Sequence, residues 1–159
     1  MLTDPKLKSQ VEALWDKLWA GGLSNPLDAI EQLSYLLFLK RLDDEENSRK
    51  RTADLRGTEY QPLFNDEKLR WKYWTGMAAG DALKHVKGKV FPELKKIGGA
   101  GSSFERQMEN AEFKINKPNL LIEACKAIDE MQISSLNQDV QGDIYEYLLS
   151  HLNSAGRNG

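Results

Sequence analysis

The chain is poor in the residue types that disulfide, zinc-binding and membrane architectures need. It has one cysteine, Cys125, so no disulfide framework can form within it. Its only two histidines, His85 and His151, give no Cys/His spacing that suits zinc. The longest apolar run, Leu36 to Leu39, is far shorter than the roughly 20 residues of a membrane helix. These absences exclude all three classes, and the single cysteine favours a reducing cytoplasm.

An excess of charge of one sign is also missing. The 22 Lys and Arg residues nearly balance the 24 Asp and Glu residues, leaving a net charge of −2. Such a chain has no global attraction for nucleic acid, so any such contact must come from local basic patches. Hydrophobic residues at 40% and charged residues at 29% are typical of a globular protein. A chain of 159 residues can form one domain around one core.

Period-2 alternation with β-branched residues is absent over any useful length, whereas helical apolar stripes recur throughout. The first predicted helix runs from Asp4, as N-cap, to Ala20, and Gly21-Gly22 ends it. A second begins at Asn25-Pro26 and continues toward Leu42. Its Leu33–Leu39 portion is apolar nearly all round, which predicts the most buried helix. The predicted fold is therefore all-α, a single irregular multi-helix bundle.

The remainder of the chain also carries helix signals. The charged stretch Asp43 to Arg56 either continues the second helix outward or forms a mobile loop. Turn and capping residues predict further helices after Asn65 or Asp66, from Pro92 to Ile97, around Phe104 to Ala111, after Pro118, and along the stripe Val140, Ile144, Leu148 and Leu152. The residues expected to be most buried are Trp15, Trp19, Leu33, Leu37, Ile144 and Leu148.

The last residues set the expected domain organisation. Residues 153–159 have nothing to pack and several types that favour turns. We therefore expect a helical domain over residues 1–152 and a flexible linker over 153–159, leading toward a catalytic domain absent from this chain.

Residues that could carry catalysis are scarce. The glycine loop Gly98 to Ser103 lacks the preceding strand and the lysine of a phosphate-binding loop, which favours a plain interhelical loop. Cys125 lies on an apolar helical face, so we interpret it as core. The acidic run Asp43 to Glu46 could hold a cation, although such a run is usually a solvated face. We therefore predict no catalytic, cofactor-binding or metal-binding residue.

Two basic clusters are the candidate DNA contacts. One window holds five lysines: Lys84, Lys87, Lys89, Lys95 and Lys96. In the other, Lys68, Arg70 and Lys72 alternate with Trp71, Tyr73 and Trp74. Such cations can bind phosphates without reading sequence. The alternative is that the aromatic residues are core and the cations a solvated face.

Three motifs in order resemble a known family. Leu33 to Leu42 reads LSYLLFLKRL and follows a Trp-bearing helix and a Gly-Gly break. Leu69-Arg70-Trp71 is a weaker match, and Gly142 to Leu149 reads GDIYEYLL before a Gly/Asn-rich tail. Together they resemble the N-terminal helical domain of the modification (DNA methyltransferase) subunit of type I restriction–modification systems. Residues 98–115 show no such likeness.

The resemblance implies a helical domain that helps to enclose double-stranded DNA and to join subunits. The implied partners are a specificity subunit, a second modification subunit and, in the full complex, a restriction subunit. The parent would methylate adenine with S-adenosylmethionine. This chain lacks the Gly-rich strand–loop and the N-P-P-[FY] segment of such enzymes, since Asn25-Pro26-Leu27 matches only two letters. The alternative is a stand-alone helical protein-interaction adaptor unrelated to DNA.

Overall fold

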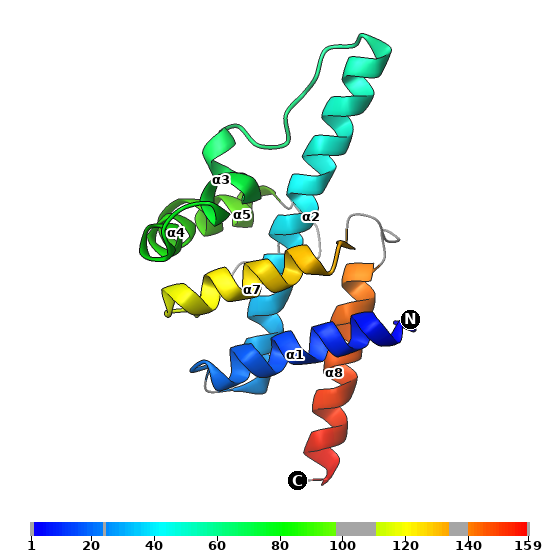
Figure 1. Ribbon diagram of the computed structural model, residues 1–159, viewed down its shortest axis with the longest axis vertical. Helices are drawn as coiled ribbons and strands as arrows, with labels where there is room; N and C mark the ends of the chain where they lie inside the picture. The colour runs from blue at the N-terminus through cyan, green and yellow to red at the C-terminus, as the bar shows by residue number, and fades with distance from the viewer. Residues whose placement is uncertain (1, 24, 98–110, 134–139, 159) are drawn as a thin grey trace. The chain divides into compact units, whose positions relative to one another are not determined.

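The computed structural model describes residues 2–23, 25–97, 111–133 and 140–158, and every regular element in these ranges is helical. This confirms the all-α prediction. The elements are α1 (Pro5–Ala20), α2 (Pro26–Arg56), η1 (Glu67–Leu69), α3 (Trp71–Thr75), α4 (Ala79–His85), η2 (Val86–Val90), α5 (Phe91–Ile97), α7 (Pro118–Glu130) and α8 (Val140–Asn158) (Figure 1). The glycine loop Gly98 to Ser103 and nearly all of the helix expected around Phe104 to Ala111 lie outside the described residues.

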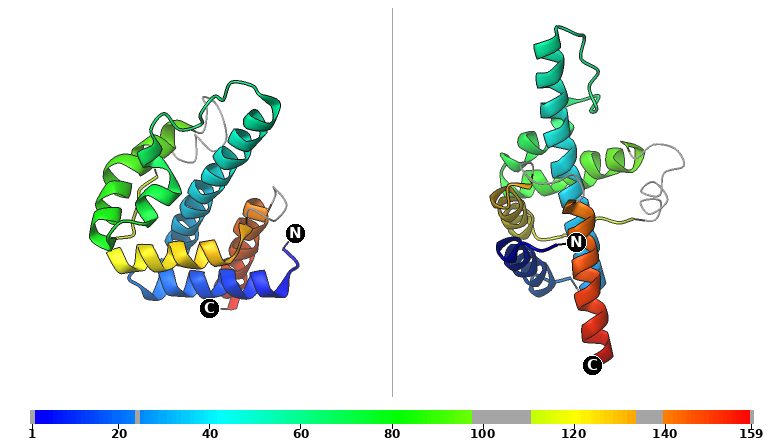
Figure 2. Two further views of the ribbon diagram at one scale, coloured as in Figure 1. Left: turned by 45° about the horizontal axis from the view of Figure 1, so that its top comes forward. Right: turned by 90° about the vertical axis from the view of Figure 1, so that its right-hand side faces the viewer.

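The chain divides into two compact units. Unit 1 comprises residues 1–38 and 114–159, and unit 2 comprises residues 39–113. Helix α2 contributes residues to both, because the division falls between Phe38 and Leu39. In unit 1, α1 and α7 lie side by side in every view (Figures 1 and 2). The expected division into a domain of residues 1–152 and a linker stays a prediction.

Helix α1 begins and ends where the sequence predicts. The Asp4 side chain accepts a hydrogen bond from Lys6 N at 3.0 Å, and Gly21 caps the other end. Its buried stripe is Leu7, Val11, Leu14 and Leu18. Trp19 follows Leu18 and is therefore rotated by about 100° from that stripe. It is 42% exposed, so its predicted burial was wrong, and Trp15 is half-buried with its indole donating to Pro26 O.

A glycine allows α1 and α7 to approach closely. A Cβ built on Gly21 would lie 2.7 Å from Leu120 Cδ2 of α7, which is closer than carbon atoms tolerate. Lys17 of α1 also pairs with Glu123 of α7 at 3.5 Å, but both side chains are about half exposed. Packing of Leu120 against Gly21 therefore holds these helices together more than the ion pair does.

Helix α8 buries the predicted positions Ile144 and Leu148 fully. On α1, Glu12 Oε1 accepts a hydrogen bond from Tyr147 Oη at 2.5 Å and lies 2.9 Å from His151 Nε2. The tyrosine thus packs and bonds within the fold. The helix continues to Asn158, past the expected end at Leu152. Ser, Asn and Ala cost a helix little, and a single glycine only about 1 kcal/mol.

In unit 2, α2 continues through the charged stretch and ends at Arg56, which confirms the helical alternative. Thr58 N donates to Ala53 O at 3.0 Å and Gly57 N donates to Asp54 O at 3.3 Å. This pair of bonds is the Schellman motif, which needs a left-handed residue after the helix. Gly57 supplies it, with a φ of 65°.

Helices α4, η2 and α5 form one uninterrupted helical rod in unit 2, because the residues at both joints have right-handed helical dihedral angles. The helix expected from Pro92 to Ile97 is therefore present as α5, although it continues from η2 without a break. Within the rod, Phe91 N donates to Val86 O, five residues back instead of four. Pro92 lacks an N–H, and its ring would clash with the carbonyl four residues earlier in a regular helix. The wide π turn accommodates that proline.

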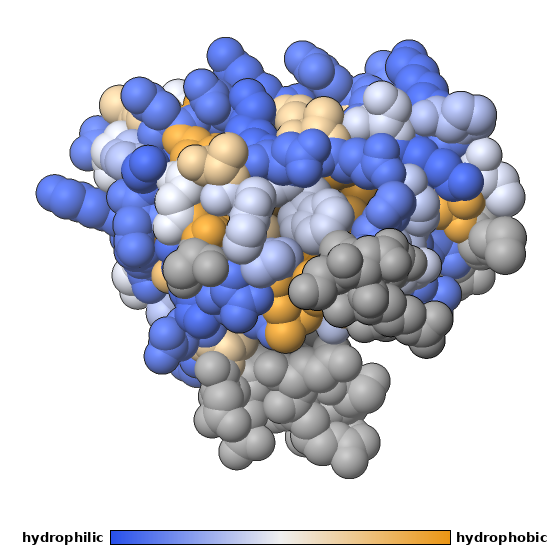
Figure 3. Space-filling model, turned by 90° about the horizontal axis from the view of Figure 1, so that it is seen from below, coloured by the Kyte–Doolittle hydropathy of each residue, from blue (hydrophilic) through white to orange (hydrophobic). Residues whose placement is uncertain are grey.

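The surface is mostly hydrophilic on the face drawn in Figure 3, where apolar residues form small separate areas. Among the described residues, the large hydrophobic side chains with substantial exposure are Trp19, Leu27, Leu55 and Tyr73. Within the described part of the chain, no helix is long and apolar enough to cross a membrane.

Candidate nucleic-acid interface

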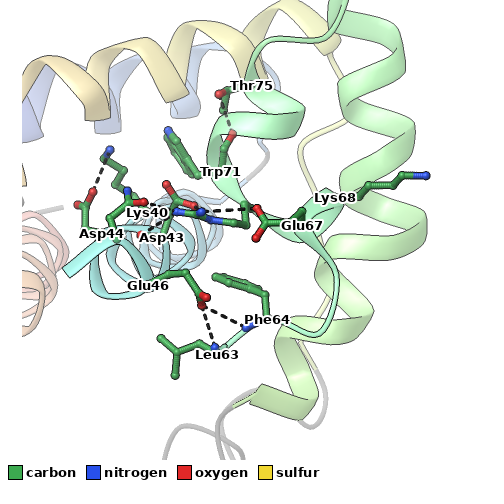
Figure 4. Close-up of polar contacts among 12 residues, drawn as sticks. Lys40, Asp43, Asp44, Glu46, Leu63, Phe64, Glu67, Lys68, Trp71 and Thr75 are labelled. Atoms are coloured by element: carbon green, nitrogen blue, oxygen red, sulfur yellow. Dashed lines mark hydrogen bonds and ion pairs between the residues drawn. The ribbon is translucent and has the colours of Figure 1, made fainter. Parts of the chain in front are cut away.

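The acidic run Asp43 to Glu46, which follows the most apolar part of α2, is buried at two of its four residues. Asp43 is 1% exposed and Glu46 is 2% exposed, whereas Asp44 and Glu45 are half-buried. The interpretation of this run as a solvated face was therefore wrong for Asp43 and Glu46. Asp43 and Glu46 are three positions apart, so both carboxylates face the same side of the helix. That side packs against the rest of unit 2 (Figure 4).

Glu46 binds the segment that returns from the end of α2. Its Oε2 accepts hydrogen bonds from Leu63 N at 2.8 Å and Phe64 N at 3.2 Å. Its Oε1 accepts a hydrogen bond from the Tyr60 hydroxyl. A buried carboxylate without such donors would be costly, so these bonds offset its desolvation. Glu46 therefore fixes the return segment along α2.

Asp43 binds Arg70, which lies between η1 and α3. Arg70 Nε donates to Asp43 Oδ1 at 2.8 Å, and its Nη2 donates to Asn47 Oδ1 at 2.5 Å. Burial lowers the pKa of the Arg70 guanidinium, but the hydrogen bond and charge of Asp43 outweigh burial and raise it. The Arg70 side chain is only 12% exposed. It holds η1 and α3 on α2, a structural role that the sequence did not indicate.

The aromatic cluster between Lys68 and Trp74 divides between core and surface. Trp71 and Trp74 are buried, with ring centroids 5.0 Å apart in an edge-to-face arrangement. Lys68 and Lys72 are exposed. The two indoles are thus core, as the alternative interpretation held, and only the lysines are available to a ligand. Tyr73 is 45% exposed and packs against the ring of His85.

The lysines of the α4–η2–α5 rod lie mainly opposite its buried stripe. The stripe comprises Ala82, Leu83, Val86, Val90, Phe91 and Leu94. The exposed residues of the rod are Gly80, Asp81, Lys84, Lys87, Gly88, Pro92 and Lys96. We call Lys84, Lys87, Lys95 and Lys96 the lysine face. The π turn adds one residue between the first two lysines and the last two, and helical spacing then places all four on one side.

The lysines between residues 84 and 96 differ in the contacts that they make within the fold. Lys89 pairs with Asp66, the N-cap of η1, at 2.6 Å, and this hydrogen bond lowers the pKa of Asp66. Lys95 Nζ lies 5.6 Å from the centroid of the Phe91 ring. Lys96 approaches Glu93 at 3.5 Å, with 74% of its side chain exposed. A pair this exposed contributes little stability and can exchange for a phosphate.

A second basic surface was not predicted from the sequence. Arg41, Arg49, Arg51 and Arg56 are exposed along α2, whereas Asp43 and Glu46 are buried. The signal was present, since basic residues follow the acidic run. The sequence did not decide between a helix and a loop for this charged stretch, however. Without a helix, the arginines could not be assigned to one side.

The described residues contain no group of three or more His, Cys, Asp or Glu side chains placed to hold a metal ion. Burial raises the pKa of the Cys125 thiol, with a smaller contribution from Asp129, so the thiol stays protonated at neutral pH. Such a thiol is a poor nucleophile. His85 is half-buried, and its Nε2–H donates a hydrogen bond to Lys68 O at 2.6 Å, which is a structural role.

Comparisons with known proteins agree with the motifs. Residues 7–128 match the HsdM N-terminal domain family. The chain is also 29% identical over 150 residues to the type I restriction enzyme EcoEI methylase subunit of Escherichia coli. That match covers 87% of this chain and 29% of the relative. No solved structure matches the chain.

The fold is thus an all-α helical domain whose sequence matches a family over most of its length. The chain belongs to the HsdM N-terminal domain family. The resemblance to this family is thereby confirmed; LSYLLFLKRL lies within the matched residues and GDIYEYLL lies beyond them.

Proposed function

We propose that this domain contacts the phosphate backbone of double-stranded DNA as the N-terminal helical part of a type I modification subunit. The lysine face carries the proposal, because its cations project from a rigid rod on the side opposite the core. Lysines arranged in this way bind phosphates without reading base sequence. Family membership favours this function over the stand-alone adaptor.

The composition of the lysine face also suits a close approach of DNA. Gly88 and Pro92, both exposed, lie between the paired lysines and carry no long side chain. A backbone ridge flanked by Lys84 and Lys96 lets phosphates come near the helix while ammonium groups reach them from both sides. Lys68 and Lys72 are further exposed cations of unit 2 that fit the same role. Arg70 is left out, because its guanidinium is bound within the fold.

The longer protein would transfer a methyl group from S-adenosylmethionine to adenine in the cytoplasm. In this proposal, the cofactor-binding and catalytic residues lie outside the present chain, which spans 29% of its curated relative. This chain would supply DNA enclosure and contacts to a specificity subunit and a second modification subunit, and a restriction subunit would join the full complex. Trp19 of unit 1 suits a subunit contact, because tryptophan is enriched at interfaces and this one is 42% exposed.

The test is charge reversal on the lysine face. Lys84→Glu combined with Lys96→Glu should weaken binding of this chain to a fluorescent 20-base-pair duplex, measured by anisotropy at several salt concentrations. The slope of log K against log salt should fall by about 0.9 for each phosphate that the variant no longer binds. The change should be equal for duplexes of unrelated sequence, since phosphate contacts do not specify bases.

The matched control is Lys6→Glu with Lys126→Glu. Both lysines are exposed, both lie in unit 1, and their reversal changes net charge by the same amount. If the control lowers affinity and salt slope as much as the lysine-face variant does, only overall charge matters and the proposed surface is wrong.

A further inference from the structure

The outer side of α2 in unit 2 presents arginines as well as hydroxyl groups. Arg41, Ser48, Arg51, Thr52 and Arg56 are all exposed. We call these five residues the arginine face. Steps of seven, four and four residues from Arg41 through Ser48 and Thr52 to Arg56 keep these positions on one side of the helix, and Arg51 flanks them. The face extends over about 22 Å, at 1.5 Å per residue.

The four acids of the run Asp43 to Glu46 divide between the two sides of α2. Asp43 and Glu46 face inward, where Arg70 and backbone N–H groups bind them. Asp44 and Glu45 lie on the outer side, where they pair with Lys40 at 3.3 Å and with Arg49 at 2.7 Å. Arg41, Arg51 and Arg56 have no acidic partner among the described residues. The inward acids therefore do not neutralise the outward guanidinium groups at close range, and these are available to an external anion.

The chemistry of the face favours phosphate. A guanidinium donates two parallel hydrogen bonds to a phosphate, whereas an ammonium acts as a point charge. The exposed hydroxyl group of Ser48 is a further polar contact of the kind made to phosphodiesters, whereas Thr52 Oγ1 donates to Ser48 O at 3.0 Å within the helix. A protein partner would require an apolar centre. The one exposed large apolar side chain between Arg41 and Arg56 is Leu55, which is 89% exposed and stands alone.

We propose that the arginine face is a second DNA-binding surface, which contacts the phosphates of a duplex independently of the lysine face. The inference rests on the proposed function only in taking double-stranded DNA as the ligand. Its residues lie on a different element, so the two surfaces can be tested separately. A face of about 22 Å meets several phosphates along a duplex, which carries one charge per roughly 1.7 Å of axis.

The experiment compares three variants of this chain on the same 20-base-pair duplex. Arg51→Gln with Arg56→Gln should reduce the salt slope by about 2 and weaken binding roughly tenfold or more near 0.1 M salt. Arg51→Lys with Arg56→Lys should keep the salt slope, because charge is retained, but should bind more weakly than the unaltered chain, because an ammonium cannot donate the paired hydrogen bonds. The control is Lys6→Gln with Lys126→Gln in unit 1, which removes the same charge elsewhere.

The outcomes separate this inference from the proposed function. An effect of the arginine variant without an effect of Lys84→Glu with Lys96→Glu would support the arginine face and overturn the lysine face. The reverse result, or an arginine variant equal to its control, would overturn the inference alone. Absence of binding to duplex DNA by the unaltered chain would overturn both. Equally tight binding to polyglutamate would show an acidic protein partner and also overturn the inference. Circular dichroism should be unchanged, since both arginines are exposed.

Discussion

Arg70 and Asp43 join two segments that are 27 residues apart, through a hydrogen bond of 2.8 Å from Nε to Oδ1 and a longer one of 3.5 Å from Nη2 to the Asp43 carbonyl oxygen. Asp43 is buried on α2, while Arg70 precedes α3, so the pair fixes the aromatic cluster of Trp71 and Trp74 against the helix. Glu67 also approaches Arg70, at 3.5 Å, but its own side chain is 79% exposed. The buried carboxylate is therefore the partner that matters for stability.

We expect Asp43→Ala to lower the free energy of unfolding by about 3–5 kcal/mol, because it leaves the Arg70 charge without its buried partner. Asp43→Asn should cost less, since the amide oxygen can still accept the Nε–H. Urea denaturation followed by circular dichroism measures both. Glu67→Ala is the control and should change stability by less than about 0.5 kcal/mol. Equal losses for Asp43→Ala and Glu67→Ala would contradict the structural role of the pair.

Two exposed glycines should respond to alanine in opposite ways. Gly57 has a φ of 65°, so Gly57→Ala should destabilise the chain by about 1 kcal/mol even though nothing lies within 4 Å of the added Cβ. Gly88 lies in a helix with equally open space, so Gly88→Ala should stabilise it by about 0.5–1 kcal/mol. Thermal unfolding of the two variants checks both signs. A gain in stability from Gly57→Ala would refute the left-handed cap.

The contact of α1 with α7 predicts that the effects of substitutions at Gly21 and Leu120 on stability depend on each other. Gly21→Ala should destabilise unit 1 by about 1–3 kcal/mol, because the new methyl group overlaps Leu120. In a Leu120→Ala background the same change should cost less, since only the Lys17 carbonyl oxygen, 2.9 Å from the added Cβ, still obstructs it. A double-mutant cycle of unfolding free energies tests this. Additive effects would mean that Leu120 does not pack on Gly21.

Most of the helices could be predicted from the sequence, because local signals specify them. Asp4 and Gly21 bound α1, and Pro118 opens α7 as expected, with Leu121, Ala124, Cys125 and Ile128 buried. The errors arose where distant residues decide the outcome. Nothing near Asp43 or Glu46 in sequence indicates that Arg70 and the Leu63–Phe64 backbone will bind them.

The basic surfaces, too, could be predicted from the sequence only in part. The lysine window could be found from composition alone, but which of its lysines face outward depends on a π turn that no propensity scale includes. The arginines of α2 form a recognisable surface only because two of the neighbouring acids, Asp43 and Glu46, are buried on the inward side. The prediction that Trp19 is buried was wrong for a simpler reason. A tryptophan at the margin of an apolar stripe fits the helical spacing even when no other residue packs over it.

The raised pKa of Tyr35 leads us to predict a loss of stability at alkaline pH. Burial, followed by the charges of Glu31, Tyr145 and Asp28, raises the pKa of its phenol to about 12. In the unfolded chain the phenol loses its proton near pH 10, so unfolding is increasingly favoured as pH rises from about 10 to about 12. Tyr35→Phe should make this decline shallower in urea unfolding at each pH. Identical declines in both proteins would contradict burial of the phenol.

The π turn and Pro92 have a consequence for insertions and deletions. Deleting Gly88 from Val86–Val90 would bring the helix back toward four-residue spacing, but the proline ring would then meet a carbonyl oxygen. Deletion together with Pro92→Ala would remove that conflict and restore an ordinary α-helix. The extra residue and the proline are therefore a compensating pair. A chain can lose both at little cost, whereas losing only the extra residue would kink the rod and disturb the spacing of its cations.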